Sequence, residues 1–411
     1  MMRFLHLADV HLDTPFAGRR PEVRRRLRGA VREAFGAAVD TALDESVDAV
    51  VIAGDLFDGA TLSFQTERFL LDELRRLTDV GIAVVYATGN HDPGRQQRRS
   101  RIAWPAGIHV ADGDGPVRIA VHDRQGRPTG WISAVGHATD REGRDLSSRF
   151  PTPAGMLPEV AVLHAQVGSS RGAEDHARYA PTTVGALRKR GFDYWALGHV
   201  HRRQELLDEP AIHYPGNIQG RTPAESGARG GLLVELDGGH PAQVVFRSFA
   251  PVRWETLDWA GWEEVDSLDA LIRSTVQRWE SWLEGEPGAR CEWMLRIRMH
   301  GGTPLWRALR DPAERETLES ELVGELGVLD VAVEADGVHA PVDPDAHRDR
   351  EDALGYALQE LERLRTGAAD GERFRSALQG WDERTETLNA YLARVLAGAD
   401  ADLVSWMREP D

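Results

Sequence analysis

Short apolar runs rich in β-branched residues recur along the first 200 residues, and each run stops at a cluster of polar side chains. Runs of about four to eight apolar residues are typical of buried strands. Between them lie longer stretches whose apolar residues recur three and four positions apart, the spacing of one helix face. Strands that alternate with helices predict an α/β layered fold. The predicted strands cover residues 4–8, 47–53, 82–87, 160–163 and 192–197, and the two clearest helices cover 24–43 and 66–77.

The polar clusters that end these five runs consist of residue types that bind metal ions. Loops at strand ends are where α/β proteins place their chemistry. Taken singly, each cluster also fits a helix cap, a tight turn or a core histidine. That interpretation does not explain why all five runs end in oxygen or nitrogen ligands, three of them after a glycine that lets the backbone turn tightly. The candidate ligands are Asp9, His11, Asp55, Asn90, His164, His199 and His201.

The chemistry of this set indicates two metal ions rather than one. Two carboxylates, one amide oxygen and four imidazoles are too many ligands for a single tetrahedral zinc, and the set contains no thiolate. It suits two divalent ions of the manganese, iron or zinc type that share a carboxylate. In an extended segment, residues two apart, such as His199 and His201, point to the same side, so both can face such a centre.

Length, charge and cysteine content set further bounds. A chain of 411 residues predicts two or three domains. The net charge of −17 arises after residue 250, since residues 1–250 carry 31 basic and 31 acidic side chains and residues 251–411 carry 18 and 35. A single cysteine, Cys291, excludes an intramolecular disulfide and a cysteine-built metal site. The chain shows neither a membrane span nor a signal peptide, so we expect a cytoplasmic protein without membrane association.

The order DxH, GDxxD, GNHD, H, GHxH resembles the calcineurin-like metallophosphoesterase superfamily, and the resemblance covers residues 1 to about 235. Within it, "FLHLADVHLDTPF" and "AGDLFD" resemble the SbcD-type DNA repair exonucleases, and "YWALGHVHRRQ" with "YPGNIQGRTPAE" resembles their YhaO-type branch. This resemblance implies a four-layer α/β/β/α sandwich, a small α/β capping domain and a C-terminal helical segment. The domains expected are residues 1–250, 251–345 and 346–411.

The resemblance also assigns roles to the candidate site residues. The first metal would be held by Asp9, His11, Asp55 and His201. The second would be held by Asp55, Asn90, His164 and His199, which makes Asp55 the bridging carboxylate. His91 would stabilise the transition state or protonate the leaving oxygen, and Asp58 would orient His91 by a hydrogen bond. The two ions are expected to be Mn²⁺, and the role of Asp92 is left open.

The five motifs do not by themselves define the substrate. The SbcD-type resemblance implies a DNA exonuclease, with endonuclease action on ends or hairpins left open. The alternatives are a phosphodiesterase or phosphomonoesterase of nucleotides or small phosphate esters, and a non-catalytic scaffold, against which the intact ligand set argues. The arginines expected to contact DNA phosphates are Arg95, Arg98, Arg99, Arg202 and Arg203. For a further group, a solvated helix face and phosphate contacts are equally good interpretations: Arg19, Arg20, Arg24, Arg25, Arg26 and Arg28.

The C-terminal third reads as a small α/β unit followed by helices. Its predicted helices cover 266–283 and 312–326, and its strands cover 293–299 and 328–335. Residues 353–365 form a helix with a leucine stripe, and a heptad seam follows at Phe374, Leu378, Trp381, Thr385, Leu388, Leu392 and Val395. These helices either pack on each other or dock the coiled coil of an SbcC- or YhaN-like ATPase, as the family implies. The family also implies a homodimer through helices near 62–77 and 95–103.

Overall fold

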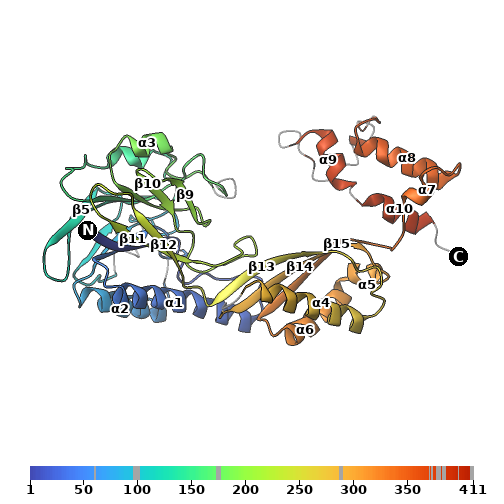
Figure 1. Ribbon diagram of the computed structural model, residues 1–411, viewed down its shortest axis with the longest axis horizontal. Coiled ribbons are helices and arrows are strands. Elements are labelled where there is room, and N and C mark those ends of the chain that lie inside the picture. The colour runs from blue at the N-terminus through green and yellow to red at the C-terminus, as the bar shows by residue number, and fades with distance from the viewer. Residues whose placement is uncertain are drawn as a thin grey trace. The chain divides into compact units, whose positions relative to one another are not determined.

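The computed structural model describes residues 1–59, 62–95, 102–172, 177–286, 290–369, 371, 374–375, 381, 386–396 and 398–407. The chain forms two compact units (Figure 1). The first contains Met1–Glu255 and Arg290–Trp293, and the second contains Thr256–Ala289 and Met294–Asp411. The expected domain boundaries at residues 250 and 345 stay predictions.

Two six-stranded sheets form the first unit. The first sheet has the order β12-β11-β1-β2-β3-β4, and its strands β1 to β4 run parallel. They comprise β1 (Met2–Leu7), β2 (Ala49–Ala53), β3 (Ala83–Ala87), β4 (Ile108–Ala111), β11 (Gly230–Leu236) and β12 (Gln243–Ser248). The second sheet has the order β5-β6-β7-β8-β10-β9. Its strands are β5 (Val117–His122), β6 (Pro128–Val135), β7 (Glu159–His164), β8 (Tyr194–Gly198), β9 (Gln204–Leu207) and β10 (Ala211–Tyr214).

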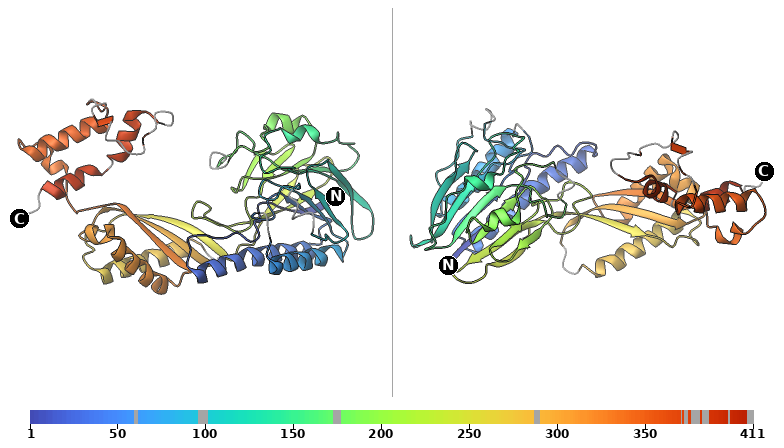
Figure 2. Two further views of the ribbon diagram at one scale, coloured as in Figure 1. Left: turned by 180° about the vertical axis from the view of Figure 1, so that it is seen from behind. Right: turned by 90° about the horizontal axis from the view of Figure 1, so that it is seen from above.

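The alternation of side chains along each strand builds four layers. Phe4 points into a core shared by both sheets, where it meets Tyr194 of β8. Its neighbour Leu5 points the other way, toward Phe35 and Leu74 of the helices α1 (Pro21–Asp44) and α2 (Phe64–Thr78). The 3-10 helix η2 (Leu146–Arg149) and helix α3 (Val184–Arg188) cover the outer face of the second sheet. Figures 1 and 2 show these layers, and the predicted four-layer sandwich is confirmed.

The second unit pairs a three-stranded sheet with helices. Strands β13 (Val252–Trp259), β14 (Glu292–Gly302) and β15 (Asp330–His339) lie in that order, with helices on one face (Figure 1). Those helices are α4 (Leu268–Glu284), α5 (Trp306–Arg310) and α6 (Pro312–Leu326). The predicted small α/β unit therefore exists, while its capping position stays a prediction. No described helix has the length and apolar character that crossing a membrane requires.

The last helices pack around α8. They are α7 (Asp345–Arg348), α8 (Ala353–Arg365), α9 (Leu388–Val395) and α10 (Ala399–Met407). Leu354 and Leu358 of α8 pack on Val404 of α10. The heptad seam predicted for residues 374–395 is wrong as one continuous helix, because Trp381 and Thr387 are not helical and the Thr387 side chain caps the start of α9. Its members Leu378 and Thr385 lie outside the described residues.

Candidate active site

The five strand-end clusters meet in one place, and all seven candidate ligands lie there. Asp55 Oδ2 is 3.4 Å from His164 Nε2 and 3.8 Å from His11 Nε2. His201 Nε2 is 3.2 Å from His11 Nε2 and 3.7 Å from Asp9 Oδ1. The second half of the cluster forms around Asn90, whose Oδ1 lies 2.9 Å from His164 Nε2 and 3.2 Å from His199 Nδ1. Six of the seven side chains are buried, and Asn90 is half-buried.

These atoms fall into groups suited to two metal ions. One group joins Asp9, His11 and His201, and another joins Asp9, Asp55 and His164, with each group's ligand atoms within 4.8 Å of one another. Asp55 Oδ2 faces both halves of the cluster. Asp9, which belongs to both groups, also lies near both halves, since its Oδ1 is 3.7 Å from His201 Nε2 and 3.9 Å from His164 Nδ1.

Each of three histidines is held by a fixed acceptor on the ring nitrogen that points away from the cluster. His164 Nδ1 lies 2.9 Å from the carbonyl oxygen of Ala53, and His199 Nε2 lies 3.0 Å from that of Ala177. His201 Nδ1 lies 2.7 Å from Oε1 of Glu225. Because these oxygens only accept, the ring proton sits on that nitrogen and the other nitrogen presents a lone pair to the cluster. The donor set therefore fits divalent metal ions.

The backbone at the cluster adopts a conformation that residues other than glycine rarely take. Asp9, His11 and Asp55 have φ angles of 50°, 52° and 50°, and His199 has 103°. Each such residue costs on the order of 1–3 kcal/mol, and strain of this kind concentrates at functional sites. Hydrogen bonds from Asp9 N to the Gly54 oxygen (3.1 Å) and from His11 N to the Asp55 oxygen (2.9 Å) hold the two loops together.

Two of the motif glycines make room for ligands. A Cβ atom on Gly54, where φ is +86°, would lie 2.2 Å from His164 Nδ1. A Cβ atom on Gly89 would lie 2.2 Å from Asp55 Oδ1 and 2.7 Å from the Asp55 nitrogen. The expected tight turns are present, and the glycines also let neighbouring loops approach so closely that the ligand side chains touch the backbone.

Burial sets the charge states of the cluster. It raises the pKa of Asp9 well above its ordinary value, and the charge of Asp55 adds to the rise. It also raises the pKa of Asp55 to about 7, with the charge of Asp92 as the next cause. Burial lowers the pKa of His11 and of His164 well below the ordinary value, so both rings are neutral at neutral pH. Neutral imidazoles beside desolvated carboxylates are suited to bind a cation.

His91 stands at the side of this cluster and is paired with Asp58. Its Nδ1 lies 2.9 Å from Asp58 Oδ1, and 42% of its side chain is exposed. This hydrogen bond raises the pKa of His91 against the effect of burial. Burial by itself would raise the pKa of Asp58, but the nearby His11 ring, the hydrogen bond to His91 and the charge of Arg221 hold it well below its usual range. The pair thus keeps a proton on His91 toward neutral pH.

The structure shows the hydrogen bonds of Asp92, whose role the sequence left open. It is fully buried and accepts hydrogen bonds from the Gly89 nitrogen (2.6 Å), the Leu56 nitrogen (2.6 Å) and the Tyr86 hydroxyl. It therefore ties the loop after β3 to the loop after β2.

Sequence reasoning missed Arg221 and Glu225, which lie in the loop after β10. Glu225 holds His201, and Arg221 Nη1 donates to Asp58 Oδ2 at 3.3 Å. Both belong to "YPGNIQGRTPAE", which follows the buried strand β10 in the same way as the other clusters follow theirs. That position was the available signal, but the segment contains no histidine or paired carboxylates to mark it.

An open cleft of about 860 Å³ gives access to the cluster. Its walls include His91, Tyr179, His199 and Arg221. Of the arginines expected to contact DNA, Arg202 lines this cleft. The two other expected arginines that the structure describes do not line it. Arg203 lies 3.8 Å over the centre of the Phe246 ring, and Arg95 is exposed near Asp114. Arg98 and Arg99 lie outside the described residues.

A second group of arginines surrounds a cavity of about 630 Å³ at the start of α1. Its arginines are Arg24, Arg25, Arg28 and Arg32, and the other lining residues are Asp13, Pro21, Leu62, Ser63 and Gln65. Arg26 points elsewhere and pairs with Glu33 and Glu292. Arginines that are neighbours in the sequence therefore have different surroundings in the fold: four line the cavity, and Arg26 forms ion pairs outside it.

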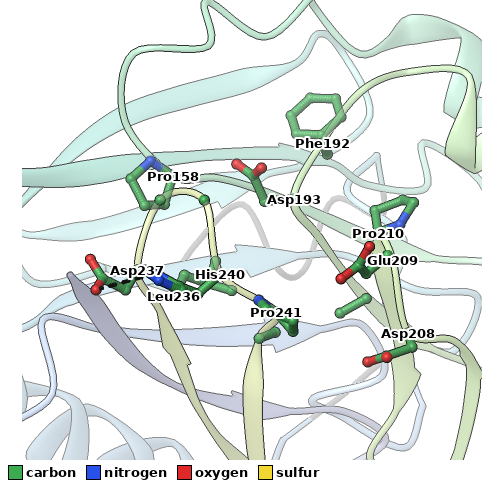
Figure 3. Close-up of a pocket in the computed structure, with 14 residues that line it drawn as sticks. Pro158, Phe192, Asp193, Asp208, Glu209, Pro210, Leu236, Asp237, His240 and Pro241 are labelled. Carbon is green, nitrogen blue, oxygen red and sulfur yellow. Dashed lines mark ion pairs between the residues drawn. The ribbon is translucent and has the colours of Figure 1, made fainter.

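A third cavity, of about 320 Å³, lies at the opposite ends of the strands (Figure 3). Pro158, Asp193 and Pro210 precede or begin β7, β8 and β10, and the turn between β11 and β12 closes the wall with His240. Its carboxylates are Asp193, Asp208, Glu209 and Asp237. Their charge opposes the binding of a phosphate ester, so the metal-ligand cleft is the better candidate for catalysis.

Comparison with known proteins agrees with this geometry. The calcineurin-like phosphoesterase family matches residues 2–203. The uncharacterised metallophosphoesterase YhaO of Bacillus subtilis is 31% identical over 311 residues, which cover 74% of this chain and 73% of that protein. The DNA double-strand break repair protein Mre11 of Aeropyrum pernix is 29% identical over 59% of each chain. One subunit of the nuclease SbcCD from Rhodobacter capsulatus is 29% identical over 58% of this chain and 67% of its own. This chain belongs to the calcineurin-like phosphoesterase family and is a metal-dependent phosphoester hydrolase.

Proposed function

We propose that this chain is a manganese-dependent DNA nuclease that acts on DNA ends or hairpins, as the nuclease subunit of a complex with an SbcC- or YhaN-like ATPase. The printed functions of the Mre11 and SbcCD relatives support a DNA substrate. The ligand set, with four imidazoles and three oxygen donors, suits divalent ions of the manganese, iron or zinc type, and the choice of manganese follows from the family resemblance. A feature of this chain's own surface favours DNA over a small phosphate ester.

The arginine-lined cavity at the start of α1 is the observation that favours DNA over a small phosphate ester as the substrate. Asp13, on its wall, lies two residues beyond His11, so this cavity adjoins the metal-ligand cluster. The charge of Asp13 is satisfied by hydrogen bonds from the Ser63 nitrogen and the Thr66 hydroxyl, each 2.6 Å long. Arg28 donates to the Thr14 and Pro15 carbonyl oxygens and Arg32 to the Thr66 hydroxyl, all neutral acceptors, so the positive charge of this wall can still attract an anion. A substrate with one phosphate needs no second anion site, whereas a DNA strand carries a phosphate at every nucleotide.

Each site residue has a defined part in the proposed reaction. Asp9, His11, Asp55 and His201 would hold one ion, and Asp55, Asn90, His164 and His199 the other. When bound, the two ions supply positive charge to the phosphate oxygens and lower the pKa of an attacking water. His91, partly exposed in the cleft, donates a proton to the leaving sugar oxygen. Asp58 accepts a hydrogen bond from the other ring nitrogen and stabilises the protonated ring.

The test compares labelled duplex and hairpin DNA with an aryl phosphodiester, each with manganese and with the ATPase present. We expect DNA cleavage, and we expect Asp55→Ala and His91→Ala to reduce it at least about 100-fold. Hydrolysis of the aryl ester while DNA stays intact would favour the alternative, a phosphodiesterase or phosphomonoesterase of nucleotides or small esters. Near-normal rates of Asp55→Ala at saturating manganese would refute the proposed site.

The proposal extends to assembly. Tyr356 of α8 and Trp406 of α10 are both 64% exposed, and exposed aromatic side chains often mark an interaction surface. They support docking of the ATPase coiled coil on the C-terminal helices. A homodimer through α2 and the segment near 95–103 follows from the family alone, and residues 96–101 of that segment lie outside the described residues. A cytoplasmic location stays a prediction.

A further inference from the structure

Arg221, His91 and Asp58 form a chain of contacts in which the carboxylate lies between the two cations. Asp58 Oδ1 is 2.9 Å from His91 Nδ1, and Asp58 Oδ2 accepts a hydrogen bond of 3.3 Å from Arg221 Nη1. Because each oxygen of the carboxylate has its own partner, its plane is fixed from both sides. Asp58 Oδ1 also lies 3.6 Å from His11 Nδ1. The orientation of His91 therefore depends on how Asp58 is held, and Arg221 holds its other oxygen.

The position of Arg221 is built by its loop. The Arg221 side chain is 16% exposed, and its Nε is buried without a hydrogen-bond partner in the described part of the chain. The Arg221 backbone nitrogen donates to Glu225 Oε2 at 2.6 Å, while Glu225 Oε1 holds His201. One glutamate thus fixes both a candidate metal ligand and the arginine that faces Asp58.

We infer that Arg221 is a positioning residue for His91, acting through Asp58, and that the loop after β10 couples proton donation to the metal cluster. The inference rests on the proposed role of His91 as the proton donor. A carboxylate that lost its arginine would be free to turn, and His91 would lose its fixed orientation. The competing role for Arg221 is a direct contact with the substrate phosphate, because it also lines the cleft.

Two arginines of the same cleft separate these roles. Arg202 lines the cleft from the exposed loop after β8, and the proposed function assigns it to substrate binding. We expect Arg221→Gln to lower kcat for DNA about 10–100-fold with little change in KM, as is usual when a group that orients a catalytic residue is lost. Arg202→Gln should instead raise KM with kcat nearly unchanged. Arg221→Lys, which keeps the charge, should recover part of kcat.

A double variant tests whether Arg221 acts through His91. If it does, Arg221→Gln has no further effect in a His91→Asn background, since the contact it supports is already gone. Multiplied effects, or a rise in KM alone for Arg221→Gln, would overturn the inference and indicate a phosphate contact. Binding of manganese must be unchanged in Arg221→Gln, because the bond to Glu225 comes from the backbone nitrogen. Lost manganese binding would also contradict the inference.

The test also separates failure of this inference from failure of the DNA assignment. If the wild-type protein leaves DNA intact, the DNA assignment fails and the same variants are compared on an aryl phosphodiester. There the inference still requires that the double variant be no slower than His91→Asn alone. A slower double variant would overturn it on that substrate as well.

Discussion

Glu225 illustrates how one partly buried carboxylate organises this site. It accepts hydrogen bonds from His201 Nδ1, from Asn217 Nδ2 at 2.9 Å and from the Arg221 nitrogen. Burial by itself would raise the pKa of Glu225, but the hydrogen bond from His201 and the charge of Arg221 hold it well below its usual range. It therefore stays ionised and keeps the proton of His201 on Nδ1, so that Nε2 presents its lone pair to the cluster.

The first prediction concerns this carboxylate. Glu225→Gln replaces an acceptor-only group with an amide that can donate to His201, so the ring can take the wrong tautomer. We expect manganese affinity to fall about 10–100-fold, measured by calorimetric titration. Glu205→Gln, at an exposed position of β9, should bind manganese like the wild type. Equal affinities for the two variants would contradict the role given to Glu225.

The second prediction concerns the space that Gly89 leaves. Gly89→Ala would place a methyl group 2.2 Å from Asp55 Oδ1, so Asp55 must move out of the cluster. We expect loss of manganese binding and of hydrolysis while the fold is kept, as judged by circular dichroism. Gly36→Ala is the matched control, because this α1 glycine has nothing within 4 Å of the added atom. It should raise stability by about 0.5–1 kcal/mol.

The third prediction is the pH dependence of metal binding. The pKa of Asp55 is raised to about 7, so its contribution to the stability of the metal-free fold is present at low pH and is lost as pH rises toward and through 7. A metal ion binds the ionised carboxylate and must displace the proton at lower pH. The rise in melting temperature with manganese, relative to EDTA, should therefore be larger at pH 7.5 than at pH 5.5. A smaller rise at pH 7.5 would contradict this assignment.

At the scale of elements, helix α1 combines two surfaces. Its apolar stripe, which includes Leu27, Val31 and Phe35, is buried, and the first turns carry the arginines of the cavity beside the site. The stripe is repeated every three or four residues, which made the helix predictable. The same pattern does not predict where each arginine side chain points, because this depends on partners from distant parts of the chain, such as Glu292.

The fourth prediction belongs to this helix. Arg24→Gln combined with Arg25→Gln should weaken DNA binding and reduce the slope of log affinity against log salt by about 0.9 for each lost phosphate contact. Fluorescence anisotropy with labelled duplex at several salt concentrations measures both. Hydrolysis of an aryl phosphodiester should be unchanged, since the two arginines lie outside the metal-ligand cleft. Arg68→Gln on α2, at an exposed position, is the control and should leave the slope unaltered.

Helix α8 and the segment after it show where local pattern succeeds and where it fails. Both ends of α8 match the prediction. Asp352 caps its start, and Leu354, Leu358 and Leu364 of the predicted stripe are buried. The heptad seam had the right spacing, but Thr387 starts a new helix within it. A capping residue such as Thr387 marks the start of a new helix, and the spacing of apolar residues by itself does not reveal it.

At the scale of the whole molecule, charge divides unequally between the two units. All of the excess acidic charge follows residue 250, whereas the metal ligands and the arginine-lined cavity lie in the first unit. Tyr356 and Trp406 are exposed aromatic side chains of the second unit, and Phe64 is one of the first. The charge distribution favours DNA binding on the first unit and a protein partner on the second.

The fifth prediction tests whether the partner protein binds at the second unit. Tyr356→Glu combined with Trp406→Glu should abolish co-purification with the ATPase and leave aryl phosphodiester hydrolysis unchanged. Glu314→Gln, a single charge change in the first turn of α6, serves as a control and should retain the partner. Undiminished co-purification of the double variant would reject docking at these side chains.

The sequence by itself predicted five strands of the first unit and the seven candidate ligands, because each ligand lies in a short motif that ends an apolar run. It also predicted an α/β layered fold, since buried strands and amphipathic helices have distinct periodicities. The four-layer sandwich and the pairing of His91 with Asp58 were implied by the family resemblance. Only the tertiary structure decided which arginines face a cavity, what Asp92 binds, and that Arg221 and Glu225 belong to the site. These depend on contacts between residues far apart in the sequence, such as Arg221 with Asp58, 163 positions apart, and Arg26 with Glu292, 266 positions apart. A local pattern cannot encode them, because such residues meet only in the tertiary structure.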